Sequence, residues 1–516
     1  MKSHKTIAFS LLLLTAQFTA AQWGPQRTPK EPDPIVKSFV EEAENNSQLE
    51  ELAFELIDVI GPRLVGSPGM EQANDWTVAK FKSWGIDAHK EEFGQWDSWQ
   101  RGITHIEMTW PRVKSLEGMQ LAWSPATKKP VEAEVIIMPQ FKNEVEFKSW
   151  LPNVKGKFVL IDQYQRWGRP DYQMKEFATE EDYQQIKDQR KADEDAYKEL
   201  IKNTGHSKNE LPTVFEDAGA AGIVGSYWTG IMGANRIFGA KTKKIPTIDL
   251  SVEDYGLLYR LTQHNKAPKI RVYAESKSNG KAKSFNTIAV IPGKEKPNEY
   301  VVLSAHLDSW DGAGGATDNG TGTITMMETA RVLKKLYPNN KRTIIIGLWG
   351  SEEQGLNGSR AFIKDNPEIV KNIQAAFNQD NGTGRIANIS GQGFVNAYDY
   401  LGRWIDALPQ AQKKHIETTY PGMPASGGSD NASFTAAGVP GIGLSSLNWG
   451  YFGYTWHTNR DTYDKIMFSE VRNNVIVAAT MVYMACEEPE MVSREKRVMP
   501  EGVDWPKSRD PKRDGN

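Results

Sequence analysis

Acidic and imidazole side chains stand at the ends of several apolar runs in the C-terminal half of the sequence. The set consists of His306, Asp308, Asp318, Glu352, Glu353, Asp380, His457 and Asp461. Apolar runs that alternate with helical stretches predict a mostly parallel sheet covered on both faces. Ligands bind beyond the carboxyl ends of the strands in such a sheet, so we expect these side chains to meet at one edge.

Each of these residues has an ordinary explanation when it is taken singly. A lone histidine such as His306 is more often structural than a ligand. Asp318 could begin a helix, and Glu352 and Glu353 could face the dipole of the next helix. Their convergence favours chemistry, because carboxylates packed together repel one another or acquire raised pKa values unless cations neutralise them.

A pair of divalent metal ions would satisfy such a set. Two imidazoles with several carboxylates, in a chain whose one cysteine is Cys486, suit Zn²⁺, with Mn²⁺ and Co²⁺ as alternatives. Two ions roughly 3.5 to 4 Å apart can lower the pKa of a shared water and polarise a carbonyl. The adjacent Glu352 and Glu353 of "GLWGSEEQG" point in different directions on a turn, so we expect them to have different roles.

The elements that must position this set are organised in successive segments. Residues 22–130 start with helical patterns and continue as strands, and they form the N-terminal part of the main domain. Residues 131–285 form an inserted domain of short strands, interrupted at about 165–212 by a charged helical insertion that we interpret as solvated. Residues 286–489 carry the candidate set, and 490–516 form a charged tail that we expect to be weakly ordered. The fold class is therefore α/β, a mixed, mostly parallel sheet sandwiched by helices, with an inserted β-rich domain.

The first residues predict an exported protein. Basic residues precede an apolar core from Ile7 to Leu14 and a small-residue cleavage site, so we interpret residues 1–21 as a signal peptide. The apolar core is far shorter than the roughly 20 residues that a membrane span needs. A single cysteine excludes intrachain disulfides, which favours a periplasmic or extracellular location in bacteria over the endoplasmic reticulum.

The charge balance excludes some classes of partner. With 62 basic and 65 acidic residues, the formal net charge is only -3. A broad field that would recruit nucleic acid or an anionic membrane is therefore not expected. The partner must be chosen by a local site, and a homodimer stays an open alternative.

Several motifs resemble those of the dinuclear-zinc exopeptidase family, which includes bacterial leucyl aminopeptidase and plasma glutamate carboxypeptidase. The strings are "SAHLDSWDGAGGATDNGTG", "LWGSEEQGLNGSRAF", "FNQDNGTG" and "HTNRDT", and "HLDSWD" is nearest to the second of these relatives. The resemblance covers about residues 286–486, with a further match at "GPRLVGSPG". The strings "GKFVLID", "DAGAAGIVG" and "IPTIDLSVEDY" resemble the protease-associated domain that is often inserted in this family. The main domain would then be a peptidase domain.

The resemblance implies a role for each residue of the set. His306 and Asp380 would bind one zinc ion, Glu353 and His457 the other, and Asp318 would bridge them. Two residues would assist the metal ligands: Glu352 as the general base that takes a proton from water, and Asp308 as the partner of the other imidazole nitrogen of His306.

Finer features follow from the same resemblance. Asp461 would play a supporting part near His457, and the Asp318–Asn319 peptide bond is expected to be cis. One departure concerns the residue before the zinc histidine, which is a tyrosine in glutamate-specific members and Trp456 here. Tyr454 or another group would then have to stabilise the tetrahedral intermediate.

The glycine-rich segment from Ser426 to Phe434, which contains Asp430, resembles the substrate-pocket loop of the family; a surface turn is the equally weighted alternative.

The implied function is that of an exported, zinc-dependent exopeptidase acting on peptides or dipeptides. Nearness to plasma glutamate carboxypeptidase favours carboxypeptidase or dipeptidase action, with aminopeptidase action as the alternative. A carboxypeptidase needs a cation for the substrate carboxylate, and Arg360, Arg385 and Arg403 are candidates. A rival of another class is a non-catalytic, receptor-like binding protein on the same fold, although such proteins usually lack metal ligands that are all present here. A single-zinc glutaminyl cyclase is disfavoured by the complete two-metal set.

Overall fold

The computed structural model describes residues 33–515. The signal peptide predicted for residues 1–21 lies outside the described residues. Within residues 33–515, no helix combines the length and apolar character that crossing a membrane requires.

The larger unit is built on a mixed, mostly parallel sheet, as the sequence predicts. Its strands have the order β13-β12-β14-β11-β9-β10-β8. β9, β10, β11 and β14 run parallel to one another, β8 runs antiparallel to β10, and β12 runs antiparallel to β14 and parallel to β13. The bounds are β8 Lys269–Ile291, β9 Lys296–His306, β10 Arg342–Trp349, β11 Ile373–Asn378, β12 Ile386–Ser390, β13 Glu417–Thr419 and β14 Gly441–Ser446.

Helices cover both faces of this sheet because its strands are apolar on both sides. In β10, Ile344, Ile346 and Leu348 pack into the core beneath one set of helices, and Ile345 and Trp349 pack into the core beneath the other. The first set is α1 Pro34–Asn45, α2 Leu49–Ala53, α3 Pro68–Ser83, α9 Thr321–Leu336, α12 Ala397–Asp406 and α15 Phe468–Glu487. The second is α10 Asn357–Asp365, α11 Pro367–Val370 and α14 Asn431–Ala436.

Shorter helical elements connect these layers. They are η1 Phe54–Ile60, η3 Ala316–Gly320, α13 Gln410–Lys413, η4 Tyr451–Thr455 and η5 Tyr463–Lys465.

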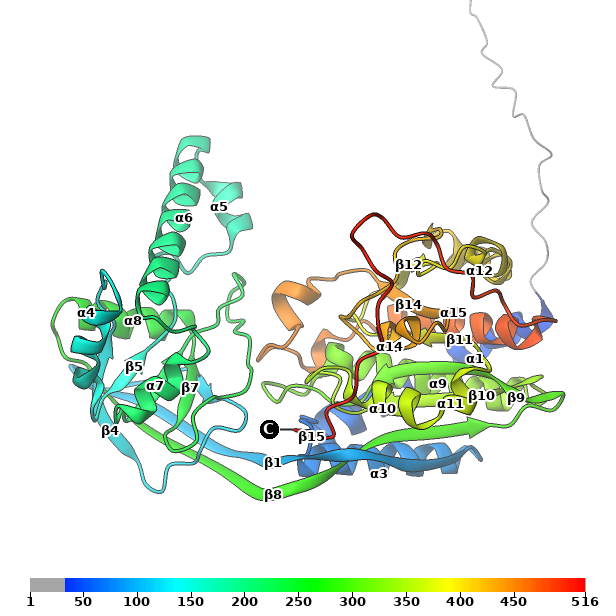
Figure 1. Cartoon of the computed structure of the whole chain (residues 1–516), viewed down its shortest axis with the longest axis horizontal. Coiled ribbons are helices and arrows are strands. Elements are labelled where there is room, and N and C mark those ends of the chain that lie inside the picture. The colour runs from blue at the N-terminus through cyan, green and yellow to red at the C-terminus, as the bar shows by residue number, and fades with distance from the viewer. Residues whose placement is uncertain (1–32, 516) are drawn as a thin grey trace, which may run out of the picture.

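The smaller unit lies at the far end of two long paired strands, β1 Asp87–Trp110 and β8, which run through both units (Figure 1). Its own sheet continues from β8 in the order β4-β5-β6-β7-β3. The bounds are β2 Lys114–Ser115, β3 Gly118–Gln120, β4 Val131–Ile137, β5 Phe158–Leu160, β6 Gly222–Gly225, β7 Thr247–Leu250, α4 Glu144–Trp150, η2 Leu151–Val154, α5 Asp171–Phe177, α6 Glu180–Asn203, α7 Leu211–Asp217 and α8 Val252–Gln263. The charged insertion corresponds to α5 and α6, of which α6 projects from the unit (Figure 1).

The core of the smaller unit reaches further toward the N-terminus than residue 131. Ile106, Met108 and Leu116 pack with strand residues such as Val135 and Ile248. We therefore propose that the boundary lies within β1 rather than at residue 131. That this unit is a protease-associated domain stays a prediction.

The C-terminal tail is held against the larger unit, in contrast to the weak order that its composition predicts. The Glu495 carbonyl accepts from the Val395 N–H at 2.8 Å, and Trp505 donates to the Thr435 carbonyl at 3.1 Å. The tail then crosses the larger unit and ends in β15 Asp514–Gly515, which pairs with β1 (Figure 1, red). These contacts offset the entropic cost of ordering a tail whose composition offers little apolar surface to bury.

Candidate metal centre

The parallel strands deliver the predicted ligands to one rim of the sheet. His306 is the last residue of β9, the Glu352–Glu353 pair follows β10, and Asp380 follows β11. Asp318 lies in η3, between β9 and α9, and His457 follows η4. Because β9, β10 and β11 are parallel, their carboxyl ends meet at the same edge, as expected.

The ligand atoms form two groups that share Asp318. In the first, His306 Nε2 lies 3.0 Å from Asp380 Oδ1 and 3.5 Å from Asp318 Oδ1. In the second, His457 Nε2 lies 2.8 Å from Glu353 Oε2 and 3.2 Å from Asp318 Oδ2. Each group offers three donor atoms close enough together to hold one ion. The two oxygens of Asp318 face different groups, which is the arrangement that a bridging carboxylate requires.

The arrangement of the donor atoms is suited to binding positive charge between them. Nδ1 of His306 lies 2.9 Å from the Asp308 carbonyl, which can only accept, so Nδ1 carries a proton and Nε2 is the atom that faces two carboxylates. Burial lowers the pKa of His306, but the charges of Asp380 and Glu352 raise it well above its usual value, so without a metal a second proton is held at Nε2. Glu353 Oε1 is buried and has no hydrogen-bond partner among the described residues. Carboxylate oxygens converge in this way without repulsion only when a proton or a metal cation lies between them.

Burial and mutual repulsion raise the pKa values of the adjacent glutamates. Burial raises the pKa of Glu352 well above its usual value, and the charges of Asp380, Asp430 and Glu353 raise it further, although His306 opposes the shift. Burial also raises the pKa of Glu353, with Asp318 as the next cause. A site that favours protonated carboxyl groups becomes fully ionised only when positive charge is supplied.

Asp308 and Asp461 support the site differently from the expectation. The Asp308 carboxylate lies 3.7 Å from His306 Nδ1, whose partner is the main-chain carbonyl of Asp308 instead. The carboxylate oxygens accept from the N–H groups of Glu352 at 3.1 Å and Glu353 at 3.3 Å. Asp308 therefore orients the glutamate pair as well as the histidine.

Asp461 holds the loop of the bridging residue rather than the ring of His457. Its carboxylate accepts from the Thr317 N–H at 2.8 Å, from the Thr317 hydroxyl at 2.8 Å and from the Asp318 N–H at 3.0 Å. Burial raises the pKa of Asp461 to about 7. The Asp318–Asn319 peptide bond is cis, which confirms that expectation.

His457 is fixed partly by the smaller unit. Its carbonyl accepts from the Ile237 N–H at 2.8 Å, and its ring meets Phe238 edge-on with 5.2 Å between centroids. On the other side the ring stacks on Trp456 at 3.9 Å. The second group of ligands therefore depends on contact between the two units.

Arg63, in the "GPRLVGSPG" turn, is a positioning residue that motif reasoning left without a role. Its fully buried guanidinium donates to the carbonyls of Leu307 at 2.7 Å, Gly61 at 3.0 Å, Gly314 at 2.6 Å and Gly315 at 2.8 Å. It thereby fixes the loop between His306 and Asp318. The sequence feature that could have indicated this role is an arginine within a Gly/Pro turn that belongs to one of the matched motifs.

A cavity of about 610 Å³ opens onto both ligand groups. Tyr451 and Trp456 line it, whereas Tyr454, suggested by the sequence for the tetrahedral intermediate, is not among the lining residues. Residues 426–429 and Asn431 also line it, so the glycine-rich segment lies at the cavity rather than forming a remote surface turn.

Of the candidate arginines, only Arg360 lines the cavity. Arg385 pairs with Glu470 at 2.6 Å, and Arg403 pairs with Glu488 at 2.7 Å. Arg509, from the tail, also lines the cavity and was not singled out from the sequence.

Comparison with known proteins agrees with this geometry. Residues 286–482 match peptidase family M28. Carboxypeptidase Q from Bos taurus is 27% identical over 451 residues, which cover 87% of each chain. The structure of a peptidase M28 precursor from Shewanella amazonensis aligns with a TM-score of 0.64 at 25% identity, covering 90% of this chain and 98% of that one. A zinc aminopeptidase from Bacillus subtilis shares the fold, with a TM-score of 0.55 at 18% identity and coverage of 88% and 97%.

The fold and the site define a metal-dependent hydrolase. Residues 286–482, which carry the donor groups, match peptidase family M28, and the class of protein is that of the metallo-exopeptidases.

Proposed function

We propose that the protein is an exported exopeptidase that uses two zinc ions, with His306, Asp380, Glu353 and His457 as terminal ligands and Asp318 as the bridge. The observation that carries this proposal is the pair of donor groups sharing Asp318 at the rim of one cavity. Imidazole and carboxylate donors suit zinc, and the Bacillus subtilis protein that shares the fold is a zinc aminopeptidase. The ions would supply Lewis-acid polarisation of the scissile carbonyl and a lower pKa for the attacking water. Export rests on the sequence of residues 1–21 alone.

Glu352 is the general base in this proposal. Its side chain lines the cavity beside Glu353, and its N–H is held by Asp308, which fixes the direction of the side chain. Its carboxylate would accept a proton from the attacking water and return it to the leaving amine. A carboxyl group with a raised pKa is suited to both transfers, because it accepts a proton more readily than an ordinary carboxylate and can then return it to the leaving amine.

Tyr451 is the best-placed donor for the negative charge that develops on the carbonyl oxygen. It lines the cavity, and burial followed by the charges of Asp318 and Asp380 raises the pKa of its phenol well above the usual value. The phenol therefore stays protonated and can donate a hydrogen bond. Trp456, which stands where a tyrosine is found in glutamate-specific relatives, need not fill this role.

The substrate class follows from the family and the cavity. Relatives include carboxypeptidase Q and leucine aminopeptidase 1, so peptides or dipeptides are the proposed substrates and the end that is cleaved is the finer question. The rival is a receptor-like binder without catalysis. Retention of the complete donor set, with a base beside it, favours the enzyme.

The test is hydrolysis of a panel of unblocked and end-blocked dipeptides by the purified chain, with and without a chelator, combined with metal analysis. We expect close to two zinc ions per chain and turnover that disappears on chelation and returns with Zn²⁺. A chain that carries no stoichiometric zinc and hydrolyses no peptide would support the binding protein instead.

A further inference from the structure

The charges that line the cavity are arranged asymmetrically. Every acidic side chain that lines it belongs to the proposed ligands and base, namely Asp318, Glu352, Glu353 and Asp380. Apart from these and His457, the charged residues in its lining are Arg360 and Arg509. A site that recognised the free amine of a substrate through spare carboxylates would need acids that this lining lacks.

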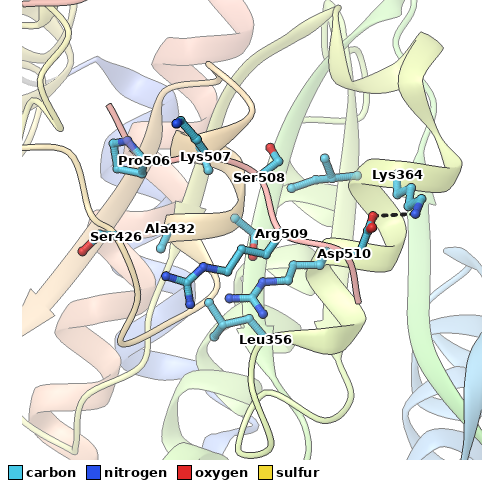
Figure 2. Close-up of a pocket in the computed structure, with 13 residues that line it drawn as sticks. Leu356, Lys364, Ser426, Ala432, Pro506, Lys507, Ser508, Arg509 and Asp510 are labelled. Carbon is cyan, nitrogen blue, oxygen red and sulfur yellow. Dashed lines mark hydrogen bonds and ion pairs between the residues drawn. The ribbon is translucent and has the colours of Figure 1, made fainter. Parts of the chain in front are cut away.

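Arg360 and Arg509 come from distant parts of the sequence and approach each other at the cavity. Arg360 is on α10, and the tail that carries Arg509 passes beside the same helix, where Figure 2 shows Arg509 near Leu356. Burial lowers the pKa of Arg360, and the charge of Arg509 is the next cause. The charges of Asp430 and Glu352 act on Arg360 in the opposite direction. Two like charges thus face the same cavity, where an anionic ligand would be stabilised by both.

Neither guanidinium forms an ion pair with a carboxylate among residues 33–515. Arg360 donates one hydrogen bond, to the Gly355 carbonyl at 2.6 Å, which places its side chain beside the turn of the glutamate pair. A guanidinium has five N–H donors, so Arg360 keeps most of its capacity. By contrast, Arg385 on the larger unit donates two hydrogen bonds to the carboxylate of Glu470.

The tail is fixed on both sides of Arg509. Before it, Trp505 donates to the Thr435 carbonyl and packs edge-on against Phe394 at 5.3 Å. After it, Asp510 pairs with Lys364 of α10 at 2.5 Å (Figure 2), and the Lys512 N–H donates to Asn357 Oδ1 at 2.8 Å. An arginine held in this way recognises a ligand at a lower entropic cost than one on a free tail.

We propose that Arg360 and Arg509 form a subsite for the carboxylate at the C-terminal end of the substrate. This inference rests on the proposed function and sharpens it to carboxypeptidase or dipeptidase action. Guanidinium groups bind carboxylates through paired N–H donors, and both lie in the cavity that holds the proposed metal ligands. The tail completes the substrate site.

The test compares a dipeptide that has a free carboxylate with its C-terminal amide, using the zinc-loaded full chain. We expect kcat/KM for the acid to exceed that for the amide by about 10- to 100-fold, the range of a hydrogen-bonded charge pair. Arg509→Gln and Arg360→Gln should each reduce this ratio mainly by raising KM for the acid, and Arg509→Lys should retain part of it. Lys512→Gln removes one charge from the same tail outside the cavity lining and should leave the ratio unchanged.

The outcomes separate this inference from the proposed function. If the wild-type chain hydrolyses both substrates equally well, or if the arginine variants slow both equally, the subsite is wrong while the exopeptidase stands. If an amide with a glutamate side chain at the C-terminal position restores the arginine-dependent rate, the subsite reads an acidic side chain and the terminal assignment is overturned. If neither substrate is hydrolysed by the wild type, the proposed function itself fails. Thermal unfolding and zinc content of each variant identify any loss of folding.

Discussion

Both units of the molecule place acidic residues at the carboxyl ends of parallel strands, yet they satisfy these acids in different ways. In the smaller unit, Asp162 lies just beyond β5 and Asp249 lies in β7. Asp162 accepts from the Ser226 N–H at 2.6 Å and pairs with Lys208. Asp249 accepts from the Tyr227 N–H at 2.9 Å and from the Asn235 amide at 2.6 Å. Both acids therefore have hydrogen-bond or ion-pair partners within the protein.

At the rim of the larger unit, acids face acids and histidines. Asp318 lies between His306 and His457, and a buried oxygen of Glu353 is left without a hydrogen bond among the described residues. Similar strand topology therefore gives acids paired with protein donors in one unit and the proposed cation site in the other. What differs is the partner chemistry: an amide, a lysine and N–H groups on one side, and lone-pair donors on the other.

The largest expected effect contrasts one acid from each unit. Glu352→Gln should lower kcat by about 10²- to 10⁴-fold, because an amide cannot accept the proton of the attacking water. Zinc content should stay near that of the wild type, since Glu352 is not a proposed ligand. Asp249→Asn in the smaller unit should leave kcat within about threefold while lowering the melting temperature, because its partners are structural.

Steady-state kinetics and metal analysis of the two variants check this contrast. Near-normal turnover by Glu352→Gln would remove the proposed base, and a large loss of kcat in Asp249→Asn would show that the smaller unit takes part in the chemistry.

Buried tyrosines in the two units give the next comparison. Tyr451→Phe should lower kcat by about 10²-fold with little change in zinc content, since it removes a donor to the developing oxyanion. Tyr255 in the smaller unit donates to the Asp162 carbonyl at 2.6 Å and accepts from the Asp162 N–H at 2.8 Å. Tyr255→Phe should instead cost about 1–3 kcal/mol in the free energy of unfolding.

Measurement of kcat and of denaturant unfolding for both variants separates the two roles. A Tyr451→Phe variant that unfolds more easily but turns over normally would place that phenol among the structural tyrosines.

The sequence predicted what is encoded locally. His306, Glu353 and Asp380 end or closely follow apolar strands, so strand topology brings these three to one rim, and the α/β class follows from the same runs. Asp318 and His457 reach the rim on longer connections that contain η3 and η4. The sequence predicts that Asp308 contacts His306 but not which of its oxygens does so. The main-chain carbonyl is the partner, and this depends on the conformation of the loop after β9.

Features that depend on distant segments were not readable from the sequence. Arg509 reaches the cavity only because Trp505 and Lys512 anchor a tail whose composition predicts weak order. The sequence pattern places the entry into the smaller unit at residue 131, whereas we propose that it lies within β1, because this single strand passes from one core to the other. Tertiary contacts decide both.

Two fully buried arginines test whether the rim is specialised within the larger unit itself. Arg63→Lys should lower zinc affinity by about 10- to 100-fold, because a lysine cannot reproduce the carbonyl contacts that shape the loop of Asp318. Arg342, at the start of β10, pairs with Glu299 at 2.7 Å and donates to the Cys486 carbonyl at 2.9 Å, away from the rim. Arg342→Lys should lower stability without changing zinc affinity. Zinc titration with a competing chelator is the measurement, and equal affinities for the two variants would contradict a positioning role for Arg63.

The smallest effect concerns the pH dependence of stability and applies to both units. Burial raises the pKa of Asp461 to about 7 and that of Asp249 to about 8 in the folded chain, above the usual value of about 4 for an unfolded chain. A carboxyl group with a raised folded pKa favours folding while it is protonated. That contribution is complete below pH about 4 and is lost as pH rises through about 7 to 8. The chelated protein should therefore lose stability between pH 5 and 8.

Zinc should reduce this loss at the rim, because the positive charge offsets ionisation of the acids around it, and metal binding itself strengthens as the ligands lose protons. The part due to Asp249 should persist with zinc bound and disappear in Asp249→Asn, because its partners in the smaller unit are neutral groups. Melting temperatures from pH 5 to 8, with and without chelator, for the wild type and this variant resolve the two contributions. A chelated chain that gains stability with rising pH would mean that its buried acids are ionised without metal, and the contrast between the two units would then fail.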